Sequence, residues 1–165
     1  RQMCIRDSTH DRAGGLALRE RIHGIMADNA PNNIQHITLR WNDFDRYDHL
    51  NNCKFLDISQ EARIAFMREN FADRDQEFGV FVRHVEIDYL RPVMADTTAV
   101  EVETTVTEIG NTSFKTRQDL KDRQGRVCGV VNTVLVAVDL TTASPREITQ
   151  AERGILNAGS GESDN

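Results

Sequence analysis

The chain has 165 residues, of which 39% are hydrophobic and 28% are charged, and its net charge at pH 7 is −6. This length fits one domain, and the hydrophobic content suits a globular core, which excludes wholesale disorder. The negative charge argues against general binding to nucleic acid or to anionic membranes, and no apolar run approaches the ~18 residues of a membrane-spanning helix.

Residues 1–33 are expected to form an N-terminal extension. Residues 1–8 connect poorly with the rest of the chain and resemble translated sequencing-adaptor read-through, so they are left out of the fold prediction. The extension lacks the apolar core of a signal peptide. Apolar side chains in residues 15–27 have weak helical spacing, and Pro31 with its neighbouring asparagines indicates a loop.

The predicted main domain spans residues 34–139 and begins with a half-buried strand over residues 34–41. Apolar and polar side chains alternate there with a period of two. After an acidic loop the apolar period changes to three and four, which predicts a helix from about Cys53 to Phe71. The residues on its apolar face are Phe55, Ile58, Ala62, Ala65 and Phe66.

Four further strands are predicted over residues 80–90, 97–109, 113–122 and 127–139, and a hairpin at Gly110-Asn111 joins the middle two. The last strand is apolar on both faces, as expected of a central strand. The resulting fold class is α+β, with a largely antiparallel five-stranded sheet wrapped around one long helix.

The segment 140–165 is expected to hold a short helix and a disordered tail. Ser144, Pro145 and Glu147 fit the N-cap, N1 and N3 positions of a capping box, so the helix is predicted to begin there and to end near Leu156. Residues 159–165 are polar and glycine-containing, as is typical of a terminal tail.

The candidate site is the motif D-F-D-R-Y-D-H-L-N-N at residues 43–52, which lies between the first strand and the long helix. Asp45 can act as a base or a nucleophile toward a carbonyl, and the helix N-terminus near Asn52 can stabilise the developing oxyanion. Asp45 can equally cap the helix, and His49 can orient Asp45 or brace the turn. Both asparagine side chains of Asn51 and Asn52 also suit an N-cap.

Other residues carry weaker hypotheses. Cys53 at the helix N-terminus is a conceivable nucleophile, although no further activating group is visible. Glu61 can reach the site from the helix or lie on a solvated face. Arg91 and Lys115 can bind phosphate or act as ordinary surface charges, and Gly110 can let a ligand pass close to the chain or serve only the hairpin turn.

The cysteines and histidines indicate whether the protein binds a metal and in which cellular compartment it lies. Cys4, Cys53 and Cys128 are an odd, widely spaced set, which does not indicate a disulfide framework and favours a reducing cytoplasm. The histidines have no metal-ligand spacing with them. We therefore expect chemistry without a metal or redox cofactor.

The motif and the strand order together resemble the hotdog-fold acyl-CoA thioesterases, in particular the 4-hydroxybenzoyl-CoA thioesterase branch, over about residues 34–139. The matching motif residues include Asp45, His49 and Asn52, and two later segments also match: Tyr89-Leu90-Arg91-Pro92 and Gly110-Asn111-Thr112-Ser113. The resemblance implies thioester hydrolysis at Asp45 and polarisation of the carbonyl by the backbone N–H near Asn52.

The resemblance also implies a dimer or tetramer with sites at the subunit interface. The substrate-binding residues that we expect are Arg91, Gly110, Asn111, Ser113 and Lys115, and the substrate is an acyl-CoA or an acyl carrier protein thioester. The chain departs from the family in two places: Asp48 stands where many relatives have glycine, and Gln60 stands where bacterial relatives often have an acid, with Glu61 next to it.

Two rival functions are kept. A hotdog hydratase or dehydratase would hydrate an enoyl-CoA without releasing thiol. A non-catalytic acyl-CoA-binding module would bind acyl-CoA, measurable by calorimetry, and would also release no thiol.

Overall fold

A computed structural model of the chain describes residues 33–71 and 78–158. The predicted N-terminal helix, residues 1–8 and the polar tail lie outside these ranges. The described elements in chain order are β1 (Ile34–Thr38), the 3-10 turn η1 (Trp41–Asp43), α2 (Asn52–Phe71), β2 (Val80–Tyr89), β3 (Ala99–Ile109), β4 (Ser113–Lys121), β5 (Val127–Asp139), β6 (Ser144–Pro145) and α3 (Gln150–Ala158).

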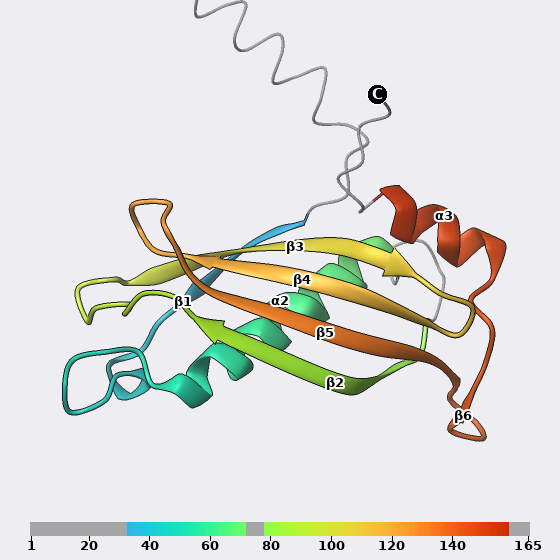
Figure 1. Cartoon of the computed structure of the whole chain (residues 1–165), viewed down its shortest axis with the longest axis horizontal. Coiled ribbons are helices and arrows are strands. Elements are labelled where there is room, and N and C mark those ends of the chain that lie inside the picture. The colour runs from blue at the N-terminus through green and yellow to red at the C-terminus, as the bar shows by residue number, and fades with distance from the viewer. Residues whose placement is uncertain (1–32, 72–77, 159–165) are drawn as a thin grey trace, which may run out of the picture. The chain divides into compact units, whose positions relative to one another are not determined.

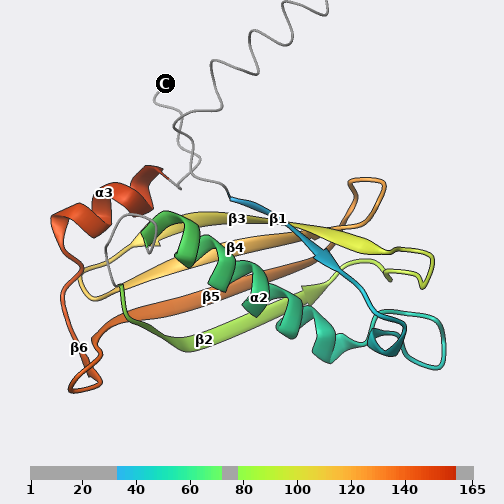
Figure 2. The same cartoon turned by 180° about the vertical axis from the view of Figure 1, so that it is seen from behind.

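The long strands form one sheet in the order β1-β3-β4-β5-β2, and every neighbouring pair is antiparallel. Helix α2 lies along one face of this sheet, as the front and rear views show (Figures 1 and 2). The predicted arrangement of an antiparallel sheet around one long helix is confirmed. The two-residue strand β6 adds to β5, and none of the described helices is long and apolar enough to cross a membrane.

The buried side chains of the strands follow the alternation predicted from the sequence. Val100, Val102 and Val106 of β3 are almost completely buried, whereas Glu101 and Glu103 between them are partly exposed. Strand β5 lies between β4 and β2, so it is an interior strand of the sheet, as predicted.

The first strand is shorter than predicted. It ends at Thr38 because Asp43 Oδ2 accepts the backbone N–H of Arg40 at 2.7 Å, and this bond folds the chain into η1. Trp41, which the alternation placed on the buried face of a strand, is consequently 90% exposed.

The predicted start of the C-terminal helix was wrong. Ser144 and Pro145 pair with β5, and α3 begins at Gln150. The capping box is instead formed by Thr149 and Glu152: Thr149 N–H donates to Glu152 Oε2 at 2.8 Å, and Glu152 N–H donates to Thr149 Oγ1 at 3.3 Å. The same local pattern occurs twice, and pairing with β5 decides which copy caps a helix.

Candidate active site

The acidic motif folds into a tight loop. Asp45 N–H donates to the carbonyl of His49 at 2.7 Å, and Asp48 N–H donates to the carbonyl of Asp45 at 3.0 Å. The loop is also bonded to the segment after β2, since Leu50 N–H donates to Val93 O at 2.8 Å. These bonds fix the loop main chain on both sides.

Asp48 has a φ of 60°, in the left-handed region. Glycine adopts this conformation without steric cost, and aspartate is among the few other residues that visit it regularly. The tight turn thus gives a physical reason for the glycine that many relatives carry here. It also shows how this chain keeps the turn without one.

The Asp45 carboxylate is held by the main chain through one of its oxygens. Asp45 Oδ1 accepts the N–H of Tyr47 at 2.8 Å and that of His49 at 3.1 Å. Asp45 Oδ2 has no hydrogen-bond partner among the described residues. The contact with His49 is made by its backbone, not by its ring. One carboxylate oxygen is therefore positioned and the other is available for chemistry.

The start of helix α2 offers a free donor. Asn51 is the N-cap: its Oδ1 accepts the N–H of Cys53 at 3.0 Å, and its carbonyl accepts the N–H of Lys54 at 2.8 Å. The N–H of Asn52, the first helical residue, has no acceptor in the described part of the chain. A free N–H at a helix N-terminus attracts negative charge.

Asp45 and Asn52 line the same hollow, which has a volume of about 240 Å³. Its other lining residues are His49, Leu50, Phe55, Tyr89, Leu90, Arg91 and Pro92. The residue with the unpaired carboxylate oxygen and the residue with the unpaired helix N–H therefore line one small cavity. Of the predicted site residues, the structure brings together Asp45, His49, Asn52 and Arg91.

The wall opposite the loop is built by the end of β2. The Tyr89 hydroxyl donates to the carbonyl of Asn52 at 3.1 Å, and the Tyr89 ring meets Phe55 edge-on with centroids 5.1 Å apart. Gly129, which pairs with Tyr89 across the sheet, makes room for Phe55: a Cβ at Gly129 would lie 2.7 Å from the phenyl ring. These contacts shape the apolar side of the hollow.

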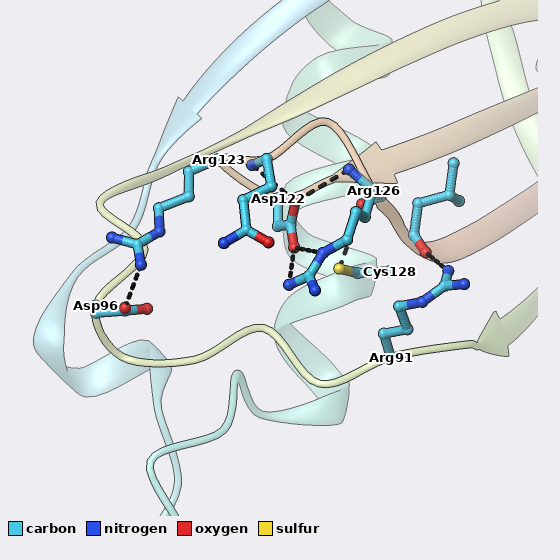
Figure 3. A network of polar contacts seen from close by, with 8 residues as sticks. Arg91, Asp96, Asp122, Arg123, Arg126 and Cys128 are labelled. Atoms are coloured by element: carbon cyan, nitrogen blue, oxygen red, sulfur yellow. Dashed lines mark hydrogen bonds and ion pairs between the residues drawn. The ribbon is translucent and has the colours of Figure 1, made fainter.

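Arg91 reaches from the rim of the hollow toward the β4–β5 turn (Figure 3). Its Nη1 donates to the carbonyl of Val127 at 2.7 Å, and it forms no ion pair with the described residues. Behind it, burial of Asp122 favours a higher pKa, but hydrogen bonds from Arg126 and Gln124 outweigh this and lower the pKa of Asp122 to about 2. Burial raises the pKa of the neighbouring Cys128 thiol.

Other candidates lie elsewhere within this chain. Glu61 lines a separate hollow of about 430 Å³ between β1 and α2, together with Asp43, Lys54 and Asp57. Lys54 Nζ lies 3.1 Å from Asp57 and 3.5 Å from Asp43, and its hydrogen bond to Asp57 raises its pKa. In the described part of the chain, no cluster of three histidine, cysteine or acidic side chains could hold a metal.

The predicted hairpin residues lie at the opposite end of the sheet from the acidic loop (Figure 1). Asn111 donates to Glu147 at 3.0 Å, Arg153 donates to the carbonyl of Gly110 at 2.8 Å, and Lys115 forms an ion pair with Glu108. This hairpin does not meet Asp45 of the same subunit.

Comparison with known proteins identifies the family. Residues 39–156 match the model of the thioesterase-like superfamily. The chain belongs to this superfamily. It is a thioester hydrolase, and its hotdog fold, predicted from the sequence, is confirmed. No curated protein matches the chain at a significant level.

The chain also aligns with almost the full length of several solved structures. The PA5185 protein of Pseudomonas aeruginosa is 26% identical, with a TM-score of 0.69 over 79% of this chain and 93% of that one. A Thermus thermophilus thioesterase complexed with coenzyme A and Zn is 25% identical, with a TM-score of 0.66 over 74% and 95%. A 1,4-dihydroxy-2-naphthoyl-CoA thioesterase from Synechocystis is 15% identical (TM-score 0.63, over 75% and 94%) and shares the fold.

The sequence-based interpretation assigned no role as cavity walls to the side chains of Tyr89 and Leu90. The segment Tyr89-Leu90-Arg91-Pro92 did carry a signal, because it matched the family pattern. Only the pairing of β2 with β5 and the hydrogen bond to Asn52 bring it to the acidic loop.

Proposed function

We propose that the protein hydrolyses an acyl-CoA thioester to a carboxylate and free CoA, with Asp45 as base or nucleophile and the N–H of Asn52 as oxyanion donor. One observation carries this proposal: Asp45 and Asn52 line the same 240 Å³ hollow, and among the described residues Asp45 Oδ2 and the Asn52 N–H have no hydrogen-bond partner. The coenzyme A bound by the Thermus thermophilus relative supports a CoA thioester as the substrate.

In the base route, Asp45 Oδ2 takes a proton from a water molecule as the water oxygen attacks the thioester carbon. The carbonyl oxygen becomes an oxyanion that accepts the N–H of Asn52, where the helix dipole adds to its stabilisation. Collapse of the tetrahedral intermediate breaks the C–S bond, and the thiolate leaves and takes up a proton. The Oδ1 bonds keep Asp45 oriented throughout.

In the nucleophile route, Asp45 Oδ2 itself attacks and expels the thiolate, which leaves a mixed anhydride on the enzyme. Water then attacks the anhydride and releases the acid. The two routes differ in where the water oxygen goes. A single turnover in ¹⁸O-water tests this. Label in Asp45 indicates the nucleophile route with attack of water on the enzyme carboxyl. Label only in the product indicates either the base route or the nucleophile route with attack of water on the acyl carbon. Mass spectrometry after rapid quenching separates these last two, because only attack on an anhydride passes through an acyl-enzyme.

Arg91 and His49 are assigned to binding and orientation. Arg91 lines the rim of the hollow and keeps guanidinium N–H groups beyond the one bonded to Val127, which suits a phosphate or an amide of the CoA arm. His49 lines the hollow and its ring makes no hydrogen bond to Asp45, so its proposed role is to orient water or the substrate.

We also propose that the working unit is a dimer formed through the edge of β2. This strand ends the sheet, and Phe81 and Val82 on it are 51% and 49% exposed. Leu56 and Ile64 of α2 are also exposed. Covering such apolar surface with a second copy is favourable.

Antiparallel pairing of two β2 edges would relate the two subunits by a two-fold axis, so that the sheet of the second subunit runs in the opposite direction. The 110–113 hairpin of the second subunit would then lie at the same end as Asp45, about three strand spacings of ~4.8 Å away from β2. In that arrangement Gly110, Asn111, Ser113 and Lys115 could serve as substrate-binding residues across the interface. Any role of Glu61 at Asp45 likewise requires the second subunit.

A thiol-release assay across short, long and aromatic acyl-CoAs, with acyl carrier protein thioesters alongside, tests the proposed activity. Hydrolysis by the wild type and its loss in Asp45→Asn support it. Hydration of an enoyl-CoA without thiol release would favour the hydratase, and binding by calorimetry without any turnover would favour the non-catalytic module.

A further inference from the structure

We propose that Trp41, Arg40 and Arg46 form a binding subsite for the adenine nucleotide end of coenzyme A. This subsite lies next to the hollow lined by Asp45 and Asn52. Because the ligand is the carrier of the proposed substrate, the inference rests on the proposed function. It goes further by assigning a nucleotide subsite, and so a reason for the enzyme to act on CoA thioesters in preference to carrier-protein thioesters.

Trp41 is unusual among the large apolar side chains described. It is 90% exposed, and the next most exposed is Tyr47 at 62%. The η1 turn projects the indole from the end of β1 into solvent, where it has no packing role. An indole displayed in this way offers its π-face to a flat partner, and nucleobases stack well on aromatic side chains.

The indole borders a second hollow, of about 590 Å³. This volume lies within the range usual for small-molecule sites. Its other lining residues are Leu39, Arg40, Phe44, Asp45, Arg46, Asp48, Ala95, Thr97 and Thr98. Asp45 lines both this hollow and the smaller one that contains Asn52. A ligand with its thioester at Asp45 can therefore place its other end beside Trp41.

The charges at this hollow suit phosphates. Arg40 forms no ion pair with any described residue. Arg46 donates to the Tyr47 hydroxyl at 2.5 Å and lies 4.7 Å from the centroid of that ring, with no carboxylate partner in the described ranges. Two arginines without acidic partners among the described residues thus line the same hollow as the exposed indole, on a chain of net charge −6. Arginine recognises phosphate oxygens through paired N–H groups.

Two acidic residues, Asp45 and Asp48, also line the hollow, and the choice of variants takes them into account. Asp45 is tied to the loop through Oδ1. The Asp48 side chain is exposed and has no partner among the described residues, so it should repel a phosphate. Asp48→Asn removes that repulsion, and asparagine tolerates the φ of 60° at this position.

The chain contains a single tryptophan, so its intrinsic fluorescence reports directly on Trp41. Adenosine 3′,5′-bisphosphate and CoA are titrated into the purified protein, with pantetheine as the ligand that lacks a nucleotide. We expect saturable quenching by the first two and none by pantetheine. Absence of quenching by adenosine 3′,5′-bisphosphate and by CoA would overturn the subsite.

Charge variants test the guanidinium groups by the same titration. The double variant Arg40→Gln/Arg46→Gln should bind adenosine 3′,5′-bisphosphate at least tenfold more weakly, and Asp48→Asn should bind it more tightly. Equal affinity in all three proteins would contradict the phosphate assignment. Circular dichroism confirms that each variant keeps its fold.

A kinetic comparison separates the subsite from the catalytic centre. For Trp41→Ala, the preference for an acyl-CoA over the same acyl group on N-acetylcysteamine, as a ratio of kcat/KM, should fall roughly tenfold. An unchanged ratio would overturn the subsite. A change in oligomeric state without weaker nucleotide binding by calorimetry would instead make Trp41 an interface residue. Nucleotide binding without any thiol release would count against the proposed function and leave the subsite standing.

Discussion

The Tyr89 hydroxyl donates a hydrogen bond to the carbonyl oxygen of Asn52 at 3.1 Å, which ties the last residue of β2 to the first residue of α2. The two residues are 37 positions apart in the chain. Through this bond the sheet fixes the helix terminus at Asn52, which lines the same hollow as Asp45.

Tyr89→Phe is expected to keep the edge-on ring contact with Phe55 and to lose only the hydroxyl. A hydrogen bond of this kind contributes about 0.5–1.5 kcal/mol, so kcat should fall roughly two- to tenfold if that energy holds the helix terminus in place. Tyr89→Ala, which also removes the ring, should cost more in both kcat and thermal stability. Steady-state kinetics of the two variants make the comparison, and equal kcat in Tyr89→Phe and wild type would show that the bond does not serve catalysis.

The two asparagines at the helix start should behave differently. Asn51→Ala removes the side chain that caps α2 and should lower the free energy of unfolding by about 1 kcal/mol. Asn52→Ala keeps the backbone N–H assigned to the oxyanion and should retain most of kcat. Urea denaturation and thiol release measure both effects. A loss of activity in Asn52→Ala as large as that in Asp45→Asn would place the chemistry on the side chain and not on the main chain.

Gly129→Ala is expected to disturb the hollow. Its new Cβ would lie 2.7 Å from the Phe55 ring, so the ring must move or the sheet must shift, at a cost of about 1–3 kcal/mol. Gly154→Ala is the matched control, because nothing lies within 4 Å of its Cβ and alanine favours the helix that contains it. We expect a lower melting temperature and a changed acyl preference for the first variant, and equal or higher stability for the control. Equal melting temperatures for Gly129→Ala and wild type would show that Phe55 has room to move.

The β4–β5 turn should make stability depend on pH. The pKa of Asp122 is about 2 in the folded protein, below its ordinary value of 3.8. A carboxyl group with a depressed folded-state pKa contributes stability that is complete above the unfolded-state pKa. That contribution, on the order of 2 kcal/mol, is lost as the pH falls from about 4 to about 2.

Asp122→Asn should therefore be less stable than wild type at pH 7, and the difference should shrink as the pH falls through this window. Asp96→Asn is the control, since the Asp96–Arg123 pair is 58% and 55% exposed and contributes little. Denaturant titrations at several pH values measure the differences. A gap between wild type and Asp122→Asn that stays constant down to pH 2 would rule out titration of Asp122 as its source.

Much of the fold was predictable because its signals are local and periodic. The alternation of Val100, Val102 and Val106 identified β3 and its buried face, and the two-sided apolar pattern of β5 identified a central strand. The C-terminal helix was misplaced for a related reason. Ser144-x-x-Glu147 and Thr149-x-x-Glu152 carry the same local capping signal, and only the pairing of Ser144 and Pro145 with β5 distinguishes them.

The candidate site was predictable where its residues are neighbours in the sequence. Asp45, His49 and Asn52 belong to one loop, and their joint position in the hollow follows from that closeness. Tyr89 reaches the hollow through the sheet register, and Trp41 becomes exposed because Asp43 bends the chain out of β1. The first relationship depends on residues far apart in the chain, and the second on a bond between Arg40 and Asp43 that the apolar alternation of residues 34–41 does not reveal.

The central claim is that the free oxygen of Asp45 carries out the chemistry, and kcat of Asp45→Asn tests it most directly. The asparagine oxygen can still accept the N–H groups of Tyr47 and His49, so the loop and the melting temperature should be preserved. We predict that kcat for acyl-CoA hydrolysis falls by roughly 10²–10⁴-fold. A folded Asp45→Asn enzyme that releases thiol at the wild-type rate would contradict the account.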